Sequence, residues 1–161
     1  MKILLLLPLF FLYSCSTTKK TDEVAEEATV INAVEKRELI KGGSSDYNEA
    51  GDLQTVRFDF NSAVVGKEAR DLLDKNISFL KANKGIKIQL EGHTDERGSG
   101  QYNLALGEIR ARRVKEYLVS MGISGKRLKV MSFGEEKPLE SAKDEEAYAK
   151  NRRVNFYILK L

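Results

Sequence analysis

The sequence predicts an α/β domain over residues 51–161, with the element order β-α-β-α-β-(α)-β. Two observations predict it. Stretches in which apolar and polar residues alternate, as in half-buried strands, take turns with stretches in which apolar residues recur at helical spacing. The connections between strands are long enough to be crossovers. At least part of the sheet is therefore expected to be parallel, with helices packed on one side.

The first half of the domain contains a strand, a helix and a second strand. LQTVRFDF (53–60) alternates apolar and polar residues, as a half-buried strand does. Apolar residues then recur at helical spacing over residues 66–85, and Gly85 stands where a C-terminal cap is expected. IKIQLEG (86–92) alternates again, with its isoleucines and its leucine on one face.

The second half repeats this alternation. A second helix is expected over residues 102–122, with Ser99 as its N-cap and Gly122 at its end. RLKVMSFG (127–134) predicts the third strand. The remaining expected elements are a short helix, DEEAYAKN (144–151), and a last strand, RRVNFYIL (152–159).

Residues 1–14 have the features of a secretory signal. One lysine precedes an apolar run of about eleven residues, whereas a membrane-spanning helix needs roughly 20. Cys15, the only cysteine, follows this run directly, with Leu12 three positions before it and a small serine just before it. LYSC resembles the lipobox of bacterial lipoproteins. Cys15 is therefore predicted to carry lipid and to anchor the mature chain in a membrane.

Residues 15–50 are predicted to form a flexible tether. From residue 16 onward the segment is polar, has Tyr47 as its one aromatic residue, and carries five Lys/Arg against eight Asp/Glu. Such a composition buries little apolar surface. Fully extended at about 3.3 Å per residue, the segment reaches roughly 115 Å. The tether would let a folded head search for a partner away from the membrane.

EGHTDERG (91–98) places the only histidine, His93, among three carboxylates, and this suggests a metal site or an acid/base pair. A zinc site takes three or four ligands, and the chain supplies no second imidazole and no cysteine near this loop. Glycan hydrolysis by paired carboxylates is disfavoured because the chain has no tryptophan to serve as a sugar platform. His93 is expected to pack or to form a hydrogen bond at the strand end, and no metal or cofactor is predicted.

Arg110 is an unusual residue on the second helix. It lies four positions from Leu106 and from Val114, on an otherwise apolar stripe. The helix begins just after EGHTDERG, so Arg110 is expected to approach Asp95. Two interpretations follow: a structural salt bridge, or opposite charges beside a notch at the helix N-terminus. The notch would suit a ligand that carries both an ammonium and a carboxylate.

GHTDERGSGQYNLALGEIRARRVKEYL, followed by FGEEKP and YAKNRRV, closely resembles the OmpA-like peptidoglycan-binding domain over about residues 56–158. The resemblance implies an α/β sandwich with a mixed sheet and without enzymatic activity. It also implies non-covalent binding of the diaminopimelate stem peptide of the cell wall. Departures from the family pattern occur at three positions outside the implied ligand contacts: Ile109, Arg112 and Arg113.

The resemblance also implies the contacts of particular residues with peptidoglycan. Asp95 would meet the amino group of the diaminopimelate side chain, and Arg110 would meet its carboxylate. The residues implied to complete the pocket, partly through backbone groups, are Asn103, Thr94, Leu106 and Asp59.

The implied location is the outer membrane, with the lipid on Cys15 as anchor and the head domain in the periplasm. The implied partners are peptidoglycan and, as part of the Tol envelope system that acts in cell division, the periplasmic Tol propeller protein. The alternatives are a lipoprotein scaffold outside that system and, more remotely, a periplasmic glycan hydrolase. The sequence pI near 8.9 suggests nucleic acid, but a secreted head of mixed surface charge disfavours it.

Overall fold

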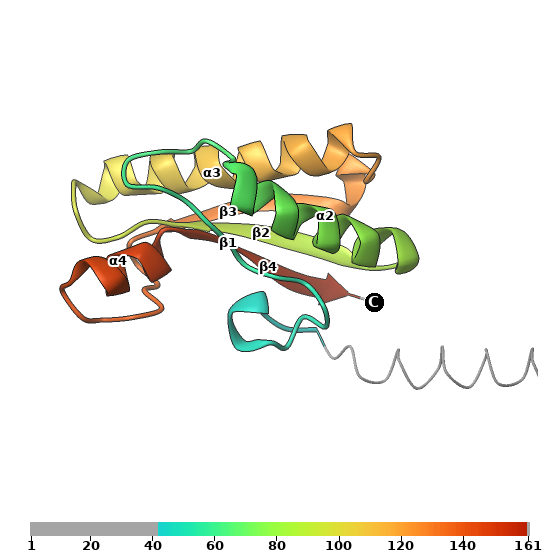
Figure 1. The fold of residues 1–161 in the computed structure, drawn as a ribbon, viewed down its shortest axis with the longest axis horizontal. Coiled ribbons are helices and arrows are strands. Elements are labelled where there is room, and N and C mark those ends of the chain that lie inside the picture. The colour runs from blue at the N-terminus through green and yellow to red at the C-terminus, as the bar shows by residue number, and fades with distance from the viewer. Residues whose placement is uncertain (1–41, 161) are drawn as a thin grey trace, which may run out of the picture. The chain divides into compact units, whose positions relative to one another are not determined.

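The four expected strands form one mixed sheet (Figure 1). The computed structural model describes residues 42–160. The predicted signal at 1–14, Cys15 and the tether up to residue 41 lie outside the described residues. The strands are β1 (Val56–Arg57), β2 (Lys87–His93), β3 (Leu128–Gly134) and β4 (Arg153–Lys160), in the sheet order β1-β4-β2-β3. β2 and β3 are parallel, while β4 runs antiparallel to β1 and to β2. The predicted fold class is confirmed.

Two long helices cover one face of the sheet, as Figure 1 shows. The α-helices are α2 (Lys67–Ala82), α3 (Gly100–Ser120) and the short α4 (Glu145–Asn151), and the 3₁₀ turns are η1 (Ser45–Tyr47) and η2 (Gly125–Arg127). Ser99 caps α3, as predicted, because its side chain accepts a hydrogen bond from the Tyr102 N–H. Asn83, rather than the predicted Gly85, is the C-cap of α2.

The core lies between the sheet and helices α2 and α3. Ile88 and Leu90 of β2 are fully buried there, together with Leu73 of α2 and Val114 of α3. At the other end of β2 the packing is closer still. A Cβ added to Gly92 would lie 1.8 Å from the Gly107 carbonyl oxygen, so the first turns of α3 rest directly on the strand. This contact brings the start of α3 beside the loop that follows β2.

The folded part begins earlier than the sequence predicts, since residues 42–50, assigned to the tether, pack on the uncovered side of the sheet. The side chains of Ser44 and Ser45 each donate a hydrogen bond to Asn155 Oδ1, at 2.9 and 2.8 Å. Asp46 forms a buried ion pair with Arg153, with 2.8 Å between Oδ2 and Nε. The predicted boundary at residue 50 is therefore wrong. A polar composition predicted a tether, but these polar groups find partners more than a hundred positions away.

β1 is shorter than predicted. Only two residues of the expected strand 53–60 join the ladder with β4. Beyond them, the Phe58 N–H still donates to the Arg152 carbonyl at 2.9 Å, and the chain then turns away from the sheet. The loop that results carries residues 59–62 towards the start of α3, where they take part in the candidate site.

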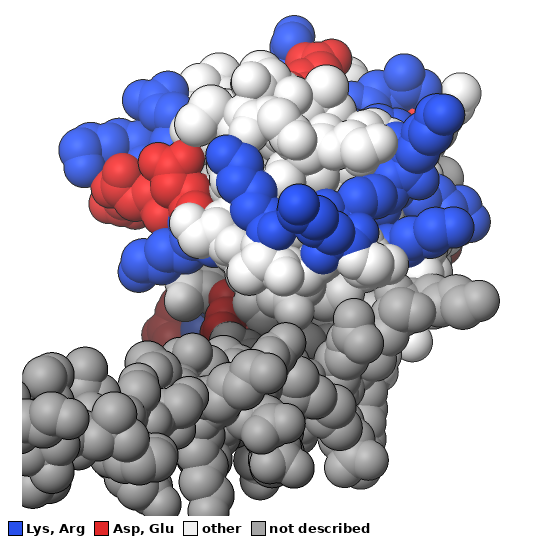
Figure 2. Space-filling view, turned by 90° about the vertical axis from the view of Figure 1, so that its right-hand side faces the viewer, with Lys and Arg blue, Asp and Glu red and all other residues white. Residues whose placement is uncertain are grey.

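Basic side chains gather at one end of the sheet (Figure 2). Figure 2 views the end where α2 and α3 finish and where β2 and β3 begin. Basic side chains form a band across the middle of this end, and acidic ones lie toward its edges. Within residues 42–160, no helix has both the length and the apolar character needed to cross a membrane.

Candidate ligand-binding site

A pocket of about 270 Å³ lies where β2 ends and α3 begins. Its walls come from the loop after β1, the loop after β2, the first turns of α3 and Arg152, just after α4. Gly98, with φ +115°, allows the tight turn between β2 and α3. Five of the six residues proposed from the resemblance line this pocket: Thr94, Asp95, Asn103, Leu106 and Arg110.

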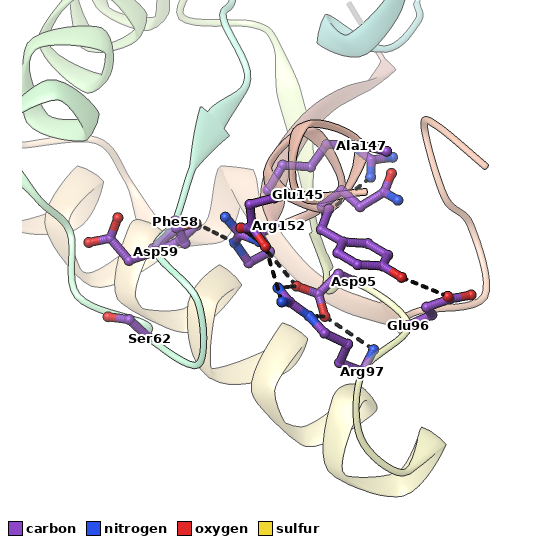
Figure 3. Close-up of polar contacts among 12 residues, drawn as sticks. Phe58, Asp59, Ser62, Asp95, Glu96, Arg97, Glu145, Ala147 and Arg152 are labelled. Carbon is purple, nitrogen blue, oxygen red and sulfur yellow. Dashed lines mark hydrogen bonds and ion pairs between the residues drawn. The ribbon is translucent and has the colours of Figure 1, made fainter. Parts of the chain in front are cut away.

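Asp95 is held by two arginines, drawn in Figure 3. Arg97 donates to it from Nη2 at 2.7 Å, from Nε at 3.2 Å and from its backbone N–H at 3.1 Å. Arg152 adds an Nη1 contact of 3.2 Å. Burial by itself would raise the pKa of the Asp95 carboxyl. The hydrogen bonds from Arg97 and Arg152 outweigh that effect and lower this pKa below its ordinary value. Asp95 is therefore an anion at neutral pH.

Arg97 closes over this carboxylate from the solvent side. Its guanidinium lies between two aromatic rings, 4.2 Å from the centroid of Phe60 and 4.6 Å from that of Tyr148. It also pairs with Glu145 at 3.1 Å. These contacts fix an otherwise flexible side chain in one orientation. Arg97 therefore both neutralises Asp95 and forms part of the pocket wall.

Arg110 is fully buried at 0% exposure, and it forms no ion pair with any carboxylate of residues 42–160 within 4.0 Å. Its guanidinium donates to three backbone carbonyls: Ser62 at 2.8 Å, His93 at 2.9 Å and Asp59 at 3.1 Å. Burial and the nearby charge of Arg152 lower the pKa of Arg110 to about 10, so it remains a cation at neutral pH. A guanidinium has five N–H donors. Two of them are left without an acceptor among the described residues.

The structural salt bridge considered between Asp95 and Arg110 does not form. Asp95 is held by Arg97 and Arg152 instead, while Arg110 is held by carbonyls of the chain. The two residues nevertheless line the same pocket, as the spacing along the sequence predicts. The pocket wall thus contains one paired carboxylate and one guanidinium without a carboxylate partner.

The remaining predicted residues have different surroundings. Asn103 is buried, and its Nδ2 donates to Glu135 and, at 3.3 Å, to the Arg97 carbonyl. The Thr94 side chain is buried, and its Oγ1 has no hydrogen-bond partner among the described residues. Leu106 contributes an apolar, half-buried side chain.

Asp59 is the predicted residue whose side chain is not in the pocket wall. Its side chain is exposed and points away from Asp95 in Figure 3. Its backbone carbonyl is what approaches the site, by accepting from Arg110. In this structure Asp59 therefore helps to hold Arg110 in place.

His93 packs, as the sequence predicts. It is 2% exposed and stacks on Phe133 with 5.6 Å between ring centroids, and neither ring nitrogen has a hydrogen-bond partner among the described residues. Burial, with smaller contributions from Arg153 and Lys137, lowers the pKa of His93 to about 3. No group of three or more His, Cys, Asp or Glu side chains within residues 42–160 is arranged to hold a metal ion.

Arg97, Arg152 and Phe60 had no predicted role at the site. Arg97 follows Asp95 by two positions, a spacing at which an aspartate often accepts a hydrogen bond from the backbone ahead of it. That signal could have indicated the Asp95–Arg97 contact. Nothing local distinguishes Arg152 from Arg153, because the site that each one joins is decided by residues more than fifty positions away.

The chain belongs to the OmpA family, whose match covers residues 57–152. This range holds the pocket, β2, β3 and the second residue of β1, and it ends just before β4. The fold and the family identification from the sequence therefore agree.

Similar proteins within this family are peptidoglycan-associated lipoproteins. That of Pseudomonas putida is 43% identical over 71% of this chain and 69% of its own length. That of Pasteurella multocida is 42% identical, over 70% and 75% respectively. The crystal structure of the peptidoglycan-associated lipoprotein from Burkholderia pseudomallei aligns with a TM-score of 0.62 at 38% identity. That alignment covers 65% of this chain and 88% of the other.

Proposed function

We propose that this protein is an outer-membrane lipoprotein that binds peptidoglycan non-covalently, through the pocket between β2 and α3. The names of its relatives, peptidoglycan-associated lipoproteins, support this proposal, as does membership of the OmpA family. The proposed ligand is the diaminopimelate residue of the stem peptide, whose side chain ends in both an ammonium and a carboxylate.

The observation that carries this proposal is that Arg110 is buried without a carboxylate partner among the described residues. A buried charge without an opposite charge is unfavourable by several kcal/mol. Arg110 is fully buried, has two N–H groups to spare and lines an open pocket. A ligand carboxylate would supply the missing charge and accept both N–H groups bidentately. Arg110 would therefore bind the diaminopimelate carboxylate.

Asp95 would bind the ammonium of the same ligand. Its pKa is lowered below its ordinary value, so its carboxyl is ionised at neutral pH, and its arginine partners fix the direction of its oxygens. Asn103 and the unpaired Thr94 hydroxyl would add hydrogen bonds, and Leu106 would pack on the methylene chain. Asp59 would act through its carbonyl, by holding Arg110.

The proposed role is that of an anchor without catalysis. The buried His93 is neutral, and its ring nitrogens are turned into the protein, so it does not suit proton transfer to a ligand. A few charge-assisted contacts give modest affinity for each molecule. Many copies, each held in the membrane by lipid on Cys15, would bind the continuous wall with avidity. Contact with the periplasmic Tol propeller protein is part of the proposal and rests only on the resemblance of the sequence to the OmpA-like peptidoglycan-binding domain.

The test is a titration of the soluble mature chain, residues 15–161 with Cys15→Ser, against two muropeptides. One contains diaminopimelate and the other contains lysine, which has the ammonium but lacks the second carboxylate. We expect binding to the first to be at least about tenfold tighter, as one charged hydrogen bond implies. Equal affinity for both muropeptides would contradict the role of Arg110.

Two substitutions test the two charges separately. Asp95→Asn should abolish detectable binding to both muropeptides. Arg110→Lys keeps the positive charge and removes the planar fork, so it should reduce the preference for diaminopimelate. Arg110→Ala is the less informative change, because it also frees three backbone carbonyls that Arg110 now satisfies. Circular dichroism of each variant serves as the control for folding.

A further inference from the structure

Five lysines gather at the end of the domain farthest from the pocket. They come from two segments, residues 81–89 and 120–131, and neither segment contains an aspartate or a glutamate. All five are exposed, and none forms an ion pair with a carboxylate among residues 42–160. These lysines, here called the basic end face, are Lys81, Lys84, Lys87, Lys126 and Lys129. Figure 2 shows the band of basic side chains at this end.

The basic end face is built on a rigid frame. Arg127 joins the two segments by donating to the carbonyls of Leu80 at 3.0 Å, Asn83 at 2.8 Å and Ile86 at 2.9 Å. These carbonyls lie at the end of α2 and in the turn that follows it, so Arg127 also caps the helix. The parallel pairing of β2 with β3 fixes Lys87 and Lys129 on neighbouring strands. The lysine backbones are therefore held in place while their charged ends extend into solvent.

The basic end face lies at the end of the domain where the described chain begins. β2 begins at the basic end face and ends at the pocket, and its seven residues span about 20 Å. Gly43, near the first described residue, accepts a hydrogen bond from the Ile158 N–H at 2.9 Å, and Ile158 pairs with Ile88 at the start of β2. The chain therefore enters the domain at the basic end, and the pocket lies at the opposite end.

The composition of the basic end face suits a surface with many mobile negative charges. A lysine is a hydrated point charge on a flexible stem, whereas recognition of one fixed anion favours the fork of an arginine. The one arginine of these segments, Arg127, already donates to three carbonyls. Met121 lies in the same segment as Lys126 and is exposed, which adds an apolar group beside the charges. Basic and apolar side chains together are typical of surfaces that lie on membranes.

We propose that the basic end face docks on a bilayer surface that carries anionic phospholipid headgroups. The proposal goes beyond wall binding, and only its choice of membrane rests on the proposed lipid anchor at Cys15. A head bound in this way has its pocket directed away from the membrane, toward the wall. Electrostatic attraction of this kind acts within a Debye length, about 8 Å at physiological salt. Docking would therefore be reversible and would compete with extension of the head toward the wall.

The test is co-sedimentation of the soluble mature chain, Cys15→Ser, with vesicles of two compositions. One contains phosphatidylcholine alone, and the other contains phosphatidylcholine mixed with phosphatidylglycerol. We expect binding to the anionic vesicles only, with an affinity that falls as salt is raised. Equal binding to both vesicle types, or to neither at low salt, would overturn the proposal.

A matched pair of triple variants locates the contact. Lys84→Gln/Lys87→Gln/Lys126→Gln removes three charges from the face, and each lysine near an anionic surface contributes roughly fivefold. We expect the combined variant to bind anionic vesicles at least about tenfold more weakly. Lys67→Gln/Lys75→Gln/Lys143→Gln removes the same charge from exposed lysines elsewhere and should leave vesicle binding nearly unchanged.

The failure of this proposal is distinguishable from the failure of wall binding. The face variant should still bind purified sacculi, and Asp95→Asn should still bind anionic vesicles. If the face variant binds anionic vesicles as well as the control does, a lipid surface is not the occupant. Loss of sacculus binding in a folded face variant would also contradict the proposal, because the face would then belong to the wall-binding site.

Discussion

Two aspartate–arginine sites of this domain are equally buried and differ in almost everything else. The side chains of Asp46 and Asp95 are 3% and 4% exposed, and each pairs with one of two consecutive arginines. Asp46 meets Arg153 and the Thr55 hydroxyl, each at 2.8 Å. Arg153 also donates from Nη1 and Nη2 to two backbone carbonyls. In this first site the two charges are paired with each other, while the site of Asp95 and Arg152 opens on a pocket.

The difference lies in the balance of charge. At Asp46 one carboxylate faces one guanidinium. The pocket wall carries three guanidinium groups, those of Arg97, Arg110 and Arg152, against Asp95 and the exposed Glu145. A surplus buried cation is unfavourable unless a ligand completes the site. Burial and ion pairing alone do not distinguish the candidate binding site from the structural site, whereas the guanidinium without a carboxylate partner does.

The largest loss of stability is expected from Asp46→Asn. It leaves Arg153 buried without its counter-charge, which should lower the free energy of unfolding by about 3–5 kcal/mol. Binding of sacculi should be unchanged at temperatures where the variant is folded. The measurements are urea unfolding and sacculus pulldown. Asp95→Asn is the matched control, with the opposite pattern expected: a loss of binding and a smaller loss of stability. The comparison would fail if Asp46→Asn, while folded, no longer bound the wall.

A smaller loss of stability is expected at acidic pH, through His93. The ring of His93 lies near Arg153, and its backbone carbonyl accepts a hydrogen bond from Arg110. Its pKa is about 3 in the folded protein and ordinarily 6.5, so the unfolded chain takes up a proton that the folded one does not. The stabilising contribution is complete above pH 6.5 and is lost as the pH falls from there toward 3. Between pH 7 and pH 5 the loss should be about 2 kcal/mol.

Unfolding by urea across this pH range measures the effect, and His93→Leu, of similar volume, should flatten the slope. Because the chain has one histidine, the NMR signals of its imidazole can be assigned without ambiguity. An imidazole that titrates near pH 6.5 in the folded protein would show that His93 is accessible to water. Such a result would overturn the expected slope.

The smallest effect is expected from Arg152→Gln, the neighbour of the structural Arg153. Asp95 keeps its contacts with Arg97, so stability should fall by only about 1–2 kcal/mol. Binding to a diaminopimelate muropeptide should weaken about tenfold, because the carboxylate is less firmly oriented. Calorimetric titration gives the affinity, and Arg153→Gln is the control. If both variants changed affinity equally, the division into a closed and an open site would be wrong.

The sequence predicted the candidate pocket well where the signal was local. The position of Arg110 on an apolar helical stripe indicated a buried cation, and Asp95 was expected nearby because its loop precedes that helix. The partners of these residues were harder to predict. Arg152, Phe60 and Tyr148 reach the site from segments far along the chain, and no periodicity shows which of them meet.

The sequence by itself determined the elements and their order, because apolar periodicity and the Ser99 cap act within a few residues. It also indicated the family, through motifs within residues 92–154 of a resemblance that covers about residues 56–158. Tertiary structure alone decided that residues 42–50 fold with the sheet, since Ser44 and Ser45 need Asn155 as their partner. It also decided which of two adjacent arginines completes a structural pair and which one borders a pocket. Such choices depend on charges from distant segments of the sequence, and these charges lie close together only in the folded chain.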